Sequence, residues 1–297
     1  MKALSFGEVL FDCYPDKNCL GGAPLNFAVY LAIGGIDTYL LSAVGDDALG
    51  ANAKSSISDF GVKTELLETY KEKQTGKCLV TLDQKGMPCY NLLNDVAYDF
   101  ISYNKRIEDY NFDVLAFGTL SLRNENNRAT LNQIIGNNKF LDIYVDLNLR
   151  KPFYSEETVR FALQNATILK LSDEELPFVS SILAIKEADE IKQLKAVFSA
   201  YKNIKLIILT KGADGSLGYD AVTGDAVYCP AKKCEIVSTV GAGDSFGSTY
   251  LASRLKGDDM KKSLALASKV SAYVVSHAGA IPENAAQDIP KIIETFS

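Results

Sequence analysis

The chain has 297 residues, and its 31 basic and 37 acidic residues leave a formal net charge of −6 with no long run of one sign. This balance argues against binding of nucleic acid through bulk charge. No apolar stretch approaches the ~20 residues that a membrane-spanning helix needs, and residues 1–8 lack a signal-peptide pattern, so we expect a cytoplasmic protein with no membrane partner.

Strand-like and helix-like segments alternate from the N-terminus onward. Short apolar runs predict strands at residues 3–10, 39–44, 114–117, 143–146, 168–171 and 206–210. Apolar residues at helical spacing predict helices at residues 24–33, 50–60, 128–135, 156–165, 246–255 and 262–276. This alternation is typical of a mostly parallel sheet with helices on both faces, and such sheets bind ligands at the carboxyl ends of their strands.

Two segments interrupt the alternation. Residues 13–20 form a short polar connection after the first strand. Residues 77–83 and 87–93, joined by the polar turn 84–86, predict a β-hairpin. A hairpin inserted into an α/β body is either a lid over a binding site or a peripheral decoration of the sheet.

Cysteine and histidine usage narrows the chemistry. The six cysteines (Cys13, Cys19, Cys78, Cys89, Cys229 and Cys234) include no C-x-x-C pair, which favours free thiols over disulfides or a zinc site. His277 is the only histidine, so a Ser-His-Asp triad or a histidine-rich zinc site would rest on it alone. The sequence also lacks the GxxxxGK[ST] pattern of a P-loop.

The most informative segment is residues 237–246 (VSTVGAGDSF). Ile236 and Val237 end a β-like run, the glycines at 241 and 243 predict a tight bend, and a helix follows. The first N–H groups of a helix have no partner within it and carry the positive end of its dipole. Glycine lets an anion approach those groups closely. Asp244 therefore places a carboxylate inside an anion-binding turn.

Three interpretations of this turn compete. Asp244 could be a first-turn acid that only caps the helix. The spacing of Gly241, Gly243 and Gly247 could belong to a dinucleotide-binding fingerprint. The second strand of that motif is missing, because residues 256–260 (KGDDM) and another helix stand in its place. The third interpretation is a phosphate-binding turn with a catalytic base, and it depends on the rest of the chain.

Further motifs accompany this turn along the whole chain. In order they are GEVLFD (7–12), GGAPLNFA (21–28), GG (34–35), AVGDDALG (43–50), VDLNLR (145–150), KLSDEE (170–175), TKGADG (210–215), GAGD (241–244) and GAIP (279–282). Together they resemble the ribokinase-like (pfkB) sugar kinases, and most of all the bacterial fructokinases. The resemblance implies a ribokinase-like three-layer α/β sandwich over residues 1–297, with a small β lid from about residues 12–22 and 74–100.

The resemblance also implies the roles of individual residues. The sugar would contact Asp12, Gly21, Gly22, Asn26 and Arg150, because a ring of hydroxyls needs donors and acceptors fixed on rigid elements. Taken alone, each residue favours a simpler interpretation, Asp12 as an exposed loop acid and Asn26 as a polar residue at a helix start, and it is their combination that favours sugar contacts.

The resemblance further implies that Asp244 accepts the proton of a primary sugar hydroxyl as that oxygen attacks the γ-phosphorus of ATP. The backbone amides of Gly241, Ala242 and Gly243 would stabilise charge on the transferring group. Asp244 and the intact glycines argue against a kinase-like protein that only binds its ligands, since such a protein could lose them.

On the nucleotide side, the resemblance implies that ATP contacts Lys170, Ser172, Thr210, Gly212 and Gly215, and that Glu175 organises Mg²⁺ through water. Ser172 and Glu175 are expected near one side of a helix start, where the family usually has Asn-x-x-Glu; otherwise Glu175 is a helix-surface acid. Ser238 replaces the Asp that binds potassium in relatives, and a hydroxyl carries no full charge. We therefore expect weak or absent K⁺ activation.

Fructose, converted to fructose 6-phosphate, is the expected substrate. The alternatives are 2-keto-3-deoxygluconate, whose carboxylate would need a cation such as Arg150 or Arg123, and ribose. A kinase-like sugar- or nucleotide-binding regulatory protein without catalysis is the alternative from a different class. The expected partners are a small sugar and ATP, and an exposed hairpin edge favours a homodimer.

Overall fold

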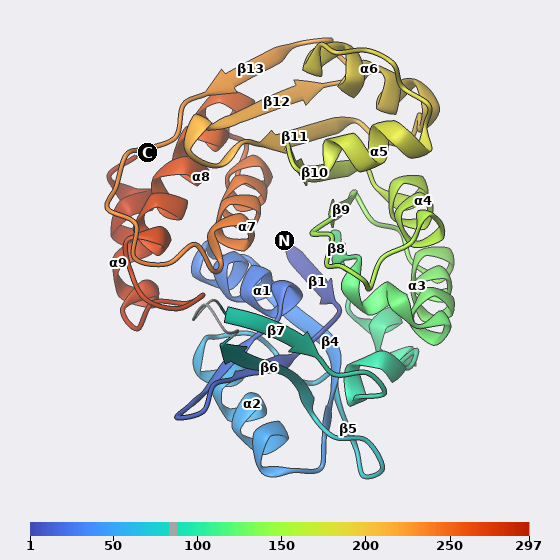
Figure 1. Cartoon of the computed structure of the whole chain (residues 1–297), viewed down its shortest axis with the longest axis vertical. Helices are drawn as coiled ribbons and strands as arrows, with labels where there is room; N and C mark the ends of the chain where they lie inside the picture. The colour runs from blue at the N-terminus through green and yellow to red at the C-terminus, as the bar shows by residue number, and fades with distance from the viewer. Residues whose placement is uncertain (83–87, 297) are drawn as a thin grey trace.

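The computed structural model describes residues 1–82 and 88–296 and is built on two sheets (Figure 1). Among these residues, nine strands form the large sheet. In spatial order they are β13 (Ala226–Cys229), β12 (Ser216–Asp220), β11 (Leu206–Thr210), β10 (Ile168–Ser172), β9 (Asp142–Asp146), β8 (Val114–Gly118), β1 (Lys2–Phe6), β4 (Asp37–Gly45) and β5 (Leu67–Tyr70). From β5 to β11 every pairing is parallel, and β12 runs antiparallel to both of its neighbours.

Helices cover both faces of the large sheet (Figure 1). One face packs against α3 (Glu125–Asn137), α4 (Glu156–Asn165), α5 (Leu176–Ile182) and α6 (Glu190–Ala200). The other packs against α1 (Ala23–Ile33), α7 (Ala242–Leu255) and α8 (Met260–Val275), with α2 (Ala48–Asp59) against β4 and β5. The helix α9 (Ala285–Glu294) packs on α1 and α8. This arrangement confirms the predicted three-layer α/β class.

Strand side chains alternate between these two cores. Leu115 and Phe117 of β8 enter the core on the α3 side, whereas Val114 and Ala116 face α1 and α7. Each fully buried Leu or Phe contributes about 1.5–3 kcal/mol through apolar burial. The strands are therefore apolar on both faces, which explains why the sequence shows them as continuous apolar runs.

The small sheet has the spatial order β3 (Asn18–Gly21), β2 (Leu10–Cys13), β6 (Gly76–Leu82) and β7 (Pro88–Leu92). The antiparallel pair β6 and β7 confirms the predicted hairpin strands, while the predicted turn at 84–86 lies outside the described residues. Short 3-10 helices connect other elements: η1 (Ala97–Phe100), η2 (Lys105–Asp109), η3 (Leu120–Arg123) and η4 (Gly212–Asp214).

Two expectations about strands were wrong, and the description of residues 13–20 was incomplete. The run at 3–10 is not one strand: β1 ends at Phe6, the chain turns away from the large sheet, and β2 begins at Leu10 in the small sheet. The polar connection at 13–20 contains β3, which pairs with β2 and so satisfies its backbone groups. Ile236 and Val237 are exposed and outside any described strand, since the Val237 N–H donates to the Val275 carbonyl at the end of α8.

The order of the strands creates a switch point at β1. From β1 the chain crosses over to β4 on one side, and β8 later pairs with β1 on the other side. Because the chain therefore connects to strands on opposite sides of β1, a crevice opens at the carboxyl ends of β1 and β8. Open α/β sheets bind ligands at such a crevice. Among the described residues, no helix has the length and apolarity that a membrane crossing requires.

Gly22, which precedes α1 beside this crevice, occupies a position that has no room for a side chain. It has φ 120°, and a Cβ atom there would lie 2.3 Å from the backbone oxygen of Glu8. We expect Gly22→Ala to lower the free energy of unfolding by about 1–3 kcal/mol, because the new methyl group forces strain on both segments.

Urea denaturation would measure this change. Gly136→Ala is the matched control, because Gly136 lies in α3 and nothing approaches the added Cβ within 4 Å. The control should stabilise the protein by up to about 1 kcal/mol. Equal stabilities for the Gly22 variant and the unsubstituted protein would contradict the prediction.

Candidate active site

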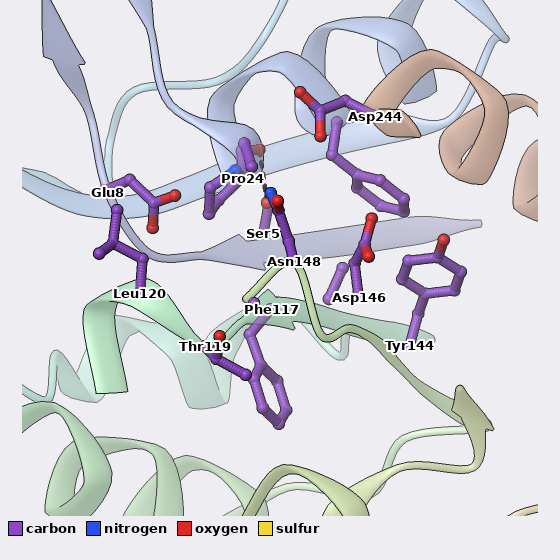
Figure 2. Close-up of a pocket in the computed structure, with 14 residues that line it drawn as sticks. Ser5, Glu8, Pro24, Phe117, Thr119, Leu120, Tyr144, Asp146, Asn148 and Asp244 are labelled. Carbon is purple, nitrogen blue, oxygen red and sulfur yellow. Dashed lines mark hydrogen bonds between the residues drawn. The ribbon is translucent and has the colours of Figure 1, made fainter. Parts of the chain in front are cut away.

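A pocket lies at the switch point, where three neighbouring strands end (Figure 2). It encloses about 370 Å³, part of it open to solvent. Its wall includes Glu8 after β1, Thr119 after β8, Asp146 and Asn148 at the end of β9, and Asp244 in the first turn of α7. The pocket therefore gathers polar side chains from segments far apart in the sequence.

The start of α7 has the expected form. Gly241 occupies the N-cap position with φ 81°, in the left-handed region, and no side chain caps this helix end. A Cβ at Gly241 would lie 2.5 Å from the Ala280 carbonyl oxygen, so the GAIP segment packs directly on the turn. The Ala242 N–H donates to the Thr239 carbonyl at 3.3 Å, so the other first-turn amides and the helix dipole are what suit this end of α7 to an anion.

Asp244 faces the pocket from this turn and is held by Asn26 at the start of α1. The Asn26 Nδ2 atom donates to Asp244 Oδ2 at 2.8 Å. Burial raises the pKa of Asp244 to about 6, and Asp146 adds to the rise, while Asn26, Lys170 and Arg150 oppose it. A carboxyl group with a pKa near 6 is ionised at neutral pH and is a stronger proton acceptor than an ordinary Asp.

A buried ion pair lies next to this turn. Lys170 Nζ lies 2.8 Å from Asp146 Oδ2, and Lys170 is only 5% exposed. Burial lowers the pKa of Lys170, but the attraction of Asp146 outweighs it, so the pKa is raised and the ammonium stays charged. A Cβ at Gly243 would lie 3.3 Å from Lys170 Nζ, which places this cation beside the first turn of α7.

The predicted sugar contacts converge from the small sheet and the loop after β9. Burial raises the pKa of Asp12 on β2, and both a hydrogen bond with the Cys78 thiol and the charge of Arg150 lower it. Arg150 is exposed and also lowers the pKa of Glu8 and of Asp244. A Cβ at Gly21 would lie 3.7 Å from Asp12 Oδ2, so this glycine adjoins the carboxylate.

The predicted nucleotide contacts lie farther along the same sheet edge. Ser172 and Thr210 are paired in register at the ends of β10 and β11. Gly212 begins the short helix η4 and Gly215 follows it, and a Cβ at Gly215 would lie 2.2 Å from the Cys229 carbonyl oxygen. In the described part of the chain, no hydrogen bond or ion pair links Ser172, Thr210 or these glycines to Asp244. They border the pocket region rather than line it.

Glu175 braces two loops. Its Oε1 accepts from the Leu149 N–H at 2.6 Å and its Oε2 from the Ser172 N–H at 2.8 Å, and burial raises its pKa. Ser172 ends β10 and Glu175 is the N-cap residue of α5, so the two lie together at a helix start, although Ser172 itself belongs to the strand. The backbone turns between strand and helix, and this turn folds the carboxylate back onto Ser172.

The carboxylates near the pocket suit a magnesium site with few protein ligands. Within residues 1–82 and 88–296, no group of three or more His, Cys, Asp or Glu side chains is placed to hold a metal ion. Mg²⁺ often uses one or two carboxylates and keeps several waters, with substrate phosphates as further ligands. Glu175 and Asp146, which interact electrostatically, are consistent with a site of that kind.

Sequence reasoning missed several residues of the pocket. Glu8, Asp146 and Asn148 all belong to the recognised motifs GEVLFD and VDLNLR, but their roles were not assigned. Glu8 is 4% exposed and burial raises its pKa to about 7. The sequence did contain a signal for Glu8, because this acid follows a buried strand and one glycine.

Comparison with known proteins gives one family. Residues 6–287 match the family model described as pfkB family carbohydrate kinase. A fructokinase of Vibrio alginolyticus is 28% identical over 273 residues, covering 86% of this chain and 84% of that protein. An ATP-dependent 6-phosphofructokinase of Thermoanaerobacterium thermosaccharolyticum is 27% identical over 280 residues, covering 91% and 83%.

Solved structures share the fold at lower identity. The fructokinase of Xylella fastidiosa with bound ATP superposes with a TM-score of 0.84 at 20% identity, covering 99% of this chain and 98% of that one. The fructokinase of Vibrio cholerae O395 in a form with fructose, ADP and calcium gives 0.81 at 22% identity, covering 100% and 99%. At these identities the likeness establishes the fold.

The raised pKa of Asp244 has a measurable consequence for stability. The folded state retains this proton between about pH 4 and 6, where the unfolded chain has released it, so stability falls as pH rises through that window. We expect Asp244→Asn to raise the free energy of unfolding at pH 8 by about 1–3 kcal/mol, and much less near pH 4.

Urea denaturation at the two pH values would test this expectation. Asp109→Asn is the control, since Asp109 is exposed and should show no such difference. The interpretation fails if Asp244→Asn leaves stability at pH 8 unchanged.

Proposed function

Because the chain belongs to the pfkB family of carbohydrate kinases, we propose that it transfers the γ-phosphoryl group of ATP to a primary hydroxyl of a sugar, with Asp244 as the proton acceptor. Family membership makes the chain a phosphotransferase that acts on a carbohydrate. The observation that supports Asp244 most directly is its place: a carboxylate with a pKa of about 6 in the uncapped first turn of α7, facing the pocket.

The proposed reaction moves one proton and exchanges one bond at phosphorus for another. The sugar hydroxyl gives its proton to Asp244 as its oxygen bonds to the γ-phosphorus, and the bond from that phosphorus to the bridging oxygen of ADP breaks. The amides of Gly241, Ala242 and Gly243 stabilise the negative charge of the transferring group. The ammonium of Lys170, beside Gly243, adds positive potential at the same place.

The sugar is held on the side of the small sheet. Asp12 and the Asn26 oxygen accept hydrogen bonds from hydroxyls, Arg150 donates, and Gly21 and Gly22 bring the backbone close. We expect the small sheet, within residues 12–22 and 74–100, to close as a lid that excludes water and limits ATP hydrolysis.

ATP is placed along the carboxyl edge from β9 to β11. Its phosphates would meet the amides before α7 and the segment containing Thr210, Gly212 and Gly215, with Ser172 and Lys170 nearby. Glu175 would hold Mg²⁺ through water, and a bound Mg²⁺ neutralises phosphate charge.

Fructose is the sugar we favour, because the motifs GEVLFD and VDLNLR are fructokinase-like and relatives at 27–28% identity are named fructokinase. 2-Keto-3-deoxygluconate is the runner-up, since Arg150 is exposed and could bind its carboxylate. Arg123 does not suit that task, because its guanidinium is bound to Asp99 and to the Leu93 carbonyl. Ribose is the third candidate substrate, after fructose and 2-keto-3-deoxygluconate.

We also propose a cytoplasmic homodimer. Leu79 and Tyr90 of the small sheet are 37% and 58% exposed, and the sheet has open edges at β3 and β7. Open strand edges with apolar side chains favour pairing with a second copy.

Substitution of Asp244 tests the proposed catalysis. We expect Asp244→Ala to lower turnover by roughly 10²–10⁴, the scale of a positioned general base, with the fold intact by circular dichroism. A coupled ADP-release assay across fructose, fructose 6-phosphate, 2-keto-3-deoxygluconate, ribose, tagatose and adenosine identifies the substrate and measures the loss. Asp109→Ala is the control, and near-normal turnover of Asp244→Ala would exclude the base.

Monovalent-cation dependence is a separate prediction. Ser238 Oγ accepts a hydrogen bond from the Val240 N–H at 3.3 Å, so the position offers a neutral and partly engaged oxygen where relatives have a carboxylate. We expect replacement of sodium by potassium at constant ionic strength to change the rate by less than about twofold. A several-fold rise would show that other groups bind the cation.

A further inference from the structure

Glu8 is a buried acidic residue of the pocket whose role is unassigned. It follows β1, is 4% exposed, and points into the pocket shared with Asp244 (Figure 2). Backbone N–H groups of Glu8 and Ala23 stabilise its carboxylate, but Oε2 is buried and has no hydrogen-bond donor among the described residues. A buried, unpaired carboxylate oxygen is expensive, so its retention calls for a donor that the folded chain does not supply.

The charges around Glu8 do not provide that donor. Asp244 on α7 repels its carboxylate, and Arg150 after β9 attracts it without a direct hydrogen bond. On the other side lie Tyr98 of η1 and Arg123 of η3, both close enough to interact electrostatically with Glu8. Arg123 is paired with Asp99 at 2.8 Å through Nε, and its Nη1 is buried without a hydrogen bond to Glu8 or to any other described residue. Burial therefore dominates and raises the pKa of Glu8 to about 7.

Other oxygens of the same site share this lack of a donor. Asp146 Oδ1, in the pocket wall, and Asn26 Oδ1, beside Asp244, are both buried without a partner. The Tyr144 hydroxyl, which also lines the pocket, is buried without a partner as well. Unpaired polar atoms of this kind match a ligand that both donates and accepts several hydrogen bonds. A polyol has this chemistry, since each hydroxyl can donate one hydrogen bond.

We propose that Glu8 determines how the sugar is oriented. Its carboxylate, which lies in a different part of the pocket wall from Asp244, accepts a hydrogen bond from one sugar hydroxyl. This inference rests on the proposed function and adds a specificity-determining contact to it. With one hydroxyl anchored at Glu8 and others at Asp12 and Asn26, only one primary hydroxyl reaches Asp244. The residue thus selects sugars by the separation between two of their hydroxyls.

A purely structural role for Glu8 predicts different behaviour. If its carboxylate only completed a buried network with the Tyr98 hydroxyl, which also lacks a partner, its loss would destabilise the fold. If the Glu8 carboxylate binds the ligand instead, its burial without a donor destabilises the unliganded protein. Glu8→Gln should then be at least as stable as the unsubstituted protein at pH 8, where Glu8 is mostly ionised.

Binding experiments at pH 8 test the contact. Isothermal titration of D-fructose and its 1-, 3- and 4-deoxy derivatives is carried out on the unsubstituted protein, Glu8→Gln and the exposed control Glu65→Gln. We expect Glu8→Gln to weaken fructose binding roughly 10-fold or more, the scale of one charge-assisted hydrogen bond. The KM for ATP should stay within about twofold, because Glu8 is on the sugar side.

The deoxy sugars locate the hydroxyl. One derivative should bind the unsubstituted protein roughly 10-fold more weakly than fructose, and this difference should disappear in Glu8→Gln, because the hydroxyl and the carboxylate act as a pair. If fructose does not bind, the same comparison uses ribose and 2-deoxyribose. Fructose affinity within twofold of normal in Glu8→Gln, or no coupling to any hydroxyl, overturns the inference.

The outcomes separate this inference from the proposed function. Turnover of a sugar with unaltered affinity in Glu8→Gln refutes the Glu8 contact and leaves the kinase assignment standing. Sugar binding that depends on Glu8 without phosphoryl transfer supports the contact and refutes the proposed reaction. Failure of the unsubstituted protein to bind any sugar of the panel overturns both.

Discussion

The hydrogen bond from Asn26 to Asp244 joins residues 218 positions apart and brings the starts of α1 and α7 together over the ends of β1, β8 and β9. The other features of the site depend on this meeting. It orients the Asp244 carboxylate, keeps the uncapped amides of α7 next to the pocket, and restrains the rise in the pKa of Asp244. The strand order makes the meeting possible, because the crossovers separate at β1.

The pocket contains more negative than positive charge. Glu8, Asp146 and Asp244 face it, while the buried cation Lys170 is paired with Asp146 and Arg150 stays exposed. Such a site is costly to the unliganded fold, as the raised pKa values of Glu8 and Asp244 indicate. Perturbed carboxylates in a cleft are typical of functional sites, where stability is sacrificed for chemistry.

Much of the fold was predictable because its signals are local. Apolar runs located β4, β8, β9, β10 and β11, and helical spacing located α4 with the observed bounds. The failures concern pairing. Residues 3–10 look continuous because both β1 and β2 are buried, and residues 13–20 look like a polar loop because β3 is half-exposed. Which strand pairs with which depends on distant segments that a local pattern does not contain.

The sequence by itself determined the α/β class and the family motifs and singled out Asp244 as the candidate base, because glycine turns and periodic apolar residues leave direct traces in the chain. Only the tertiary structure decided that Glu8 lies buried in the same pocket as Asp244, that Glu175 bridges two loops, and that Arg123 is already paired. Burial and charge environment come from segments that meet only when the sheet assembles. The raised pKa values at this site are consequences of that assembly.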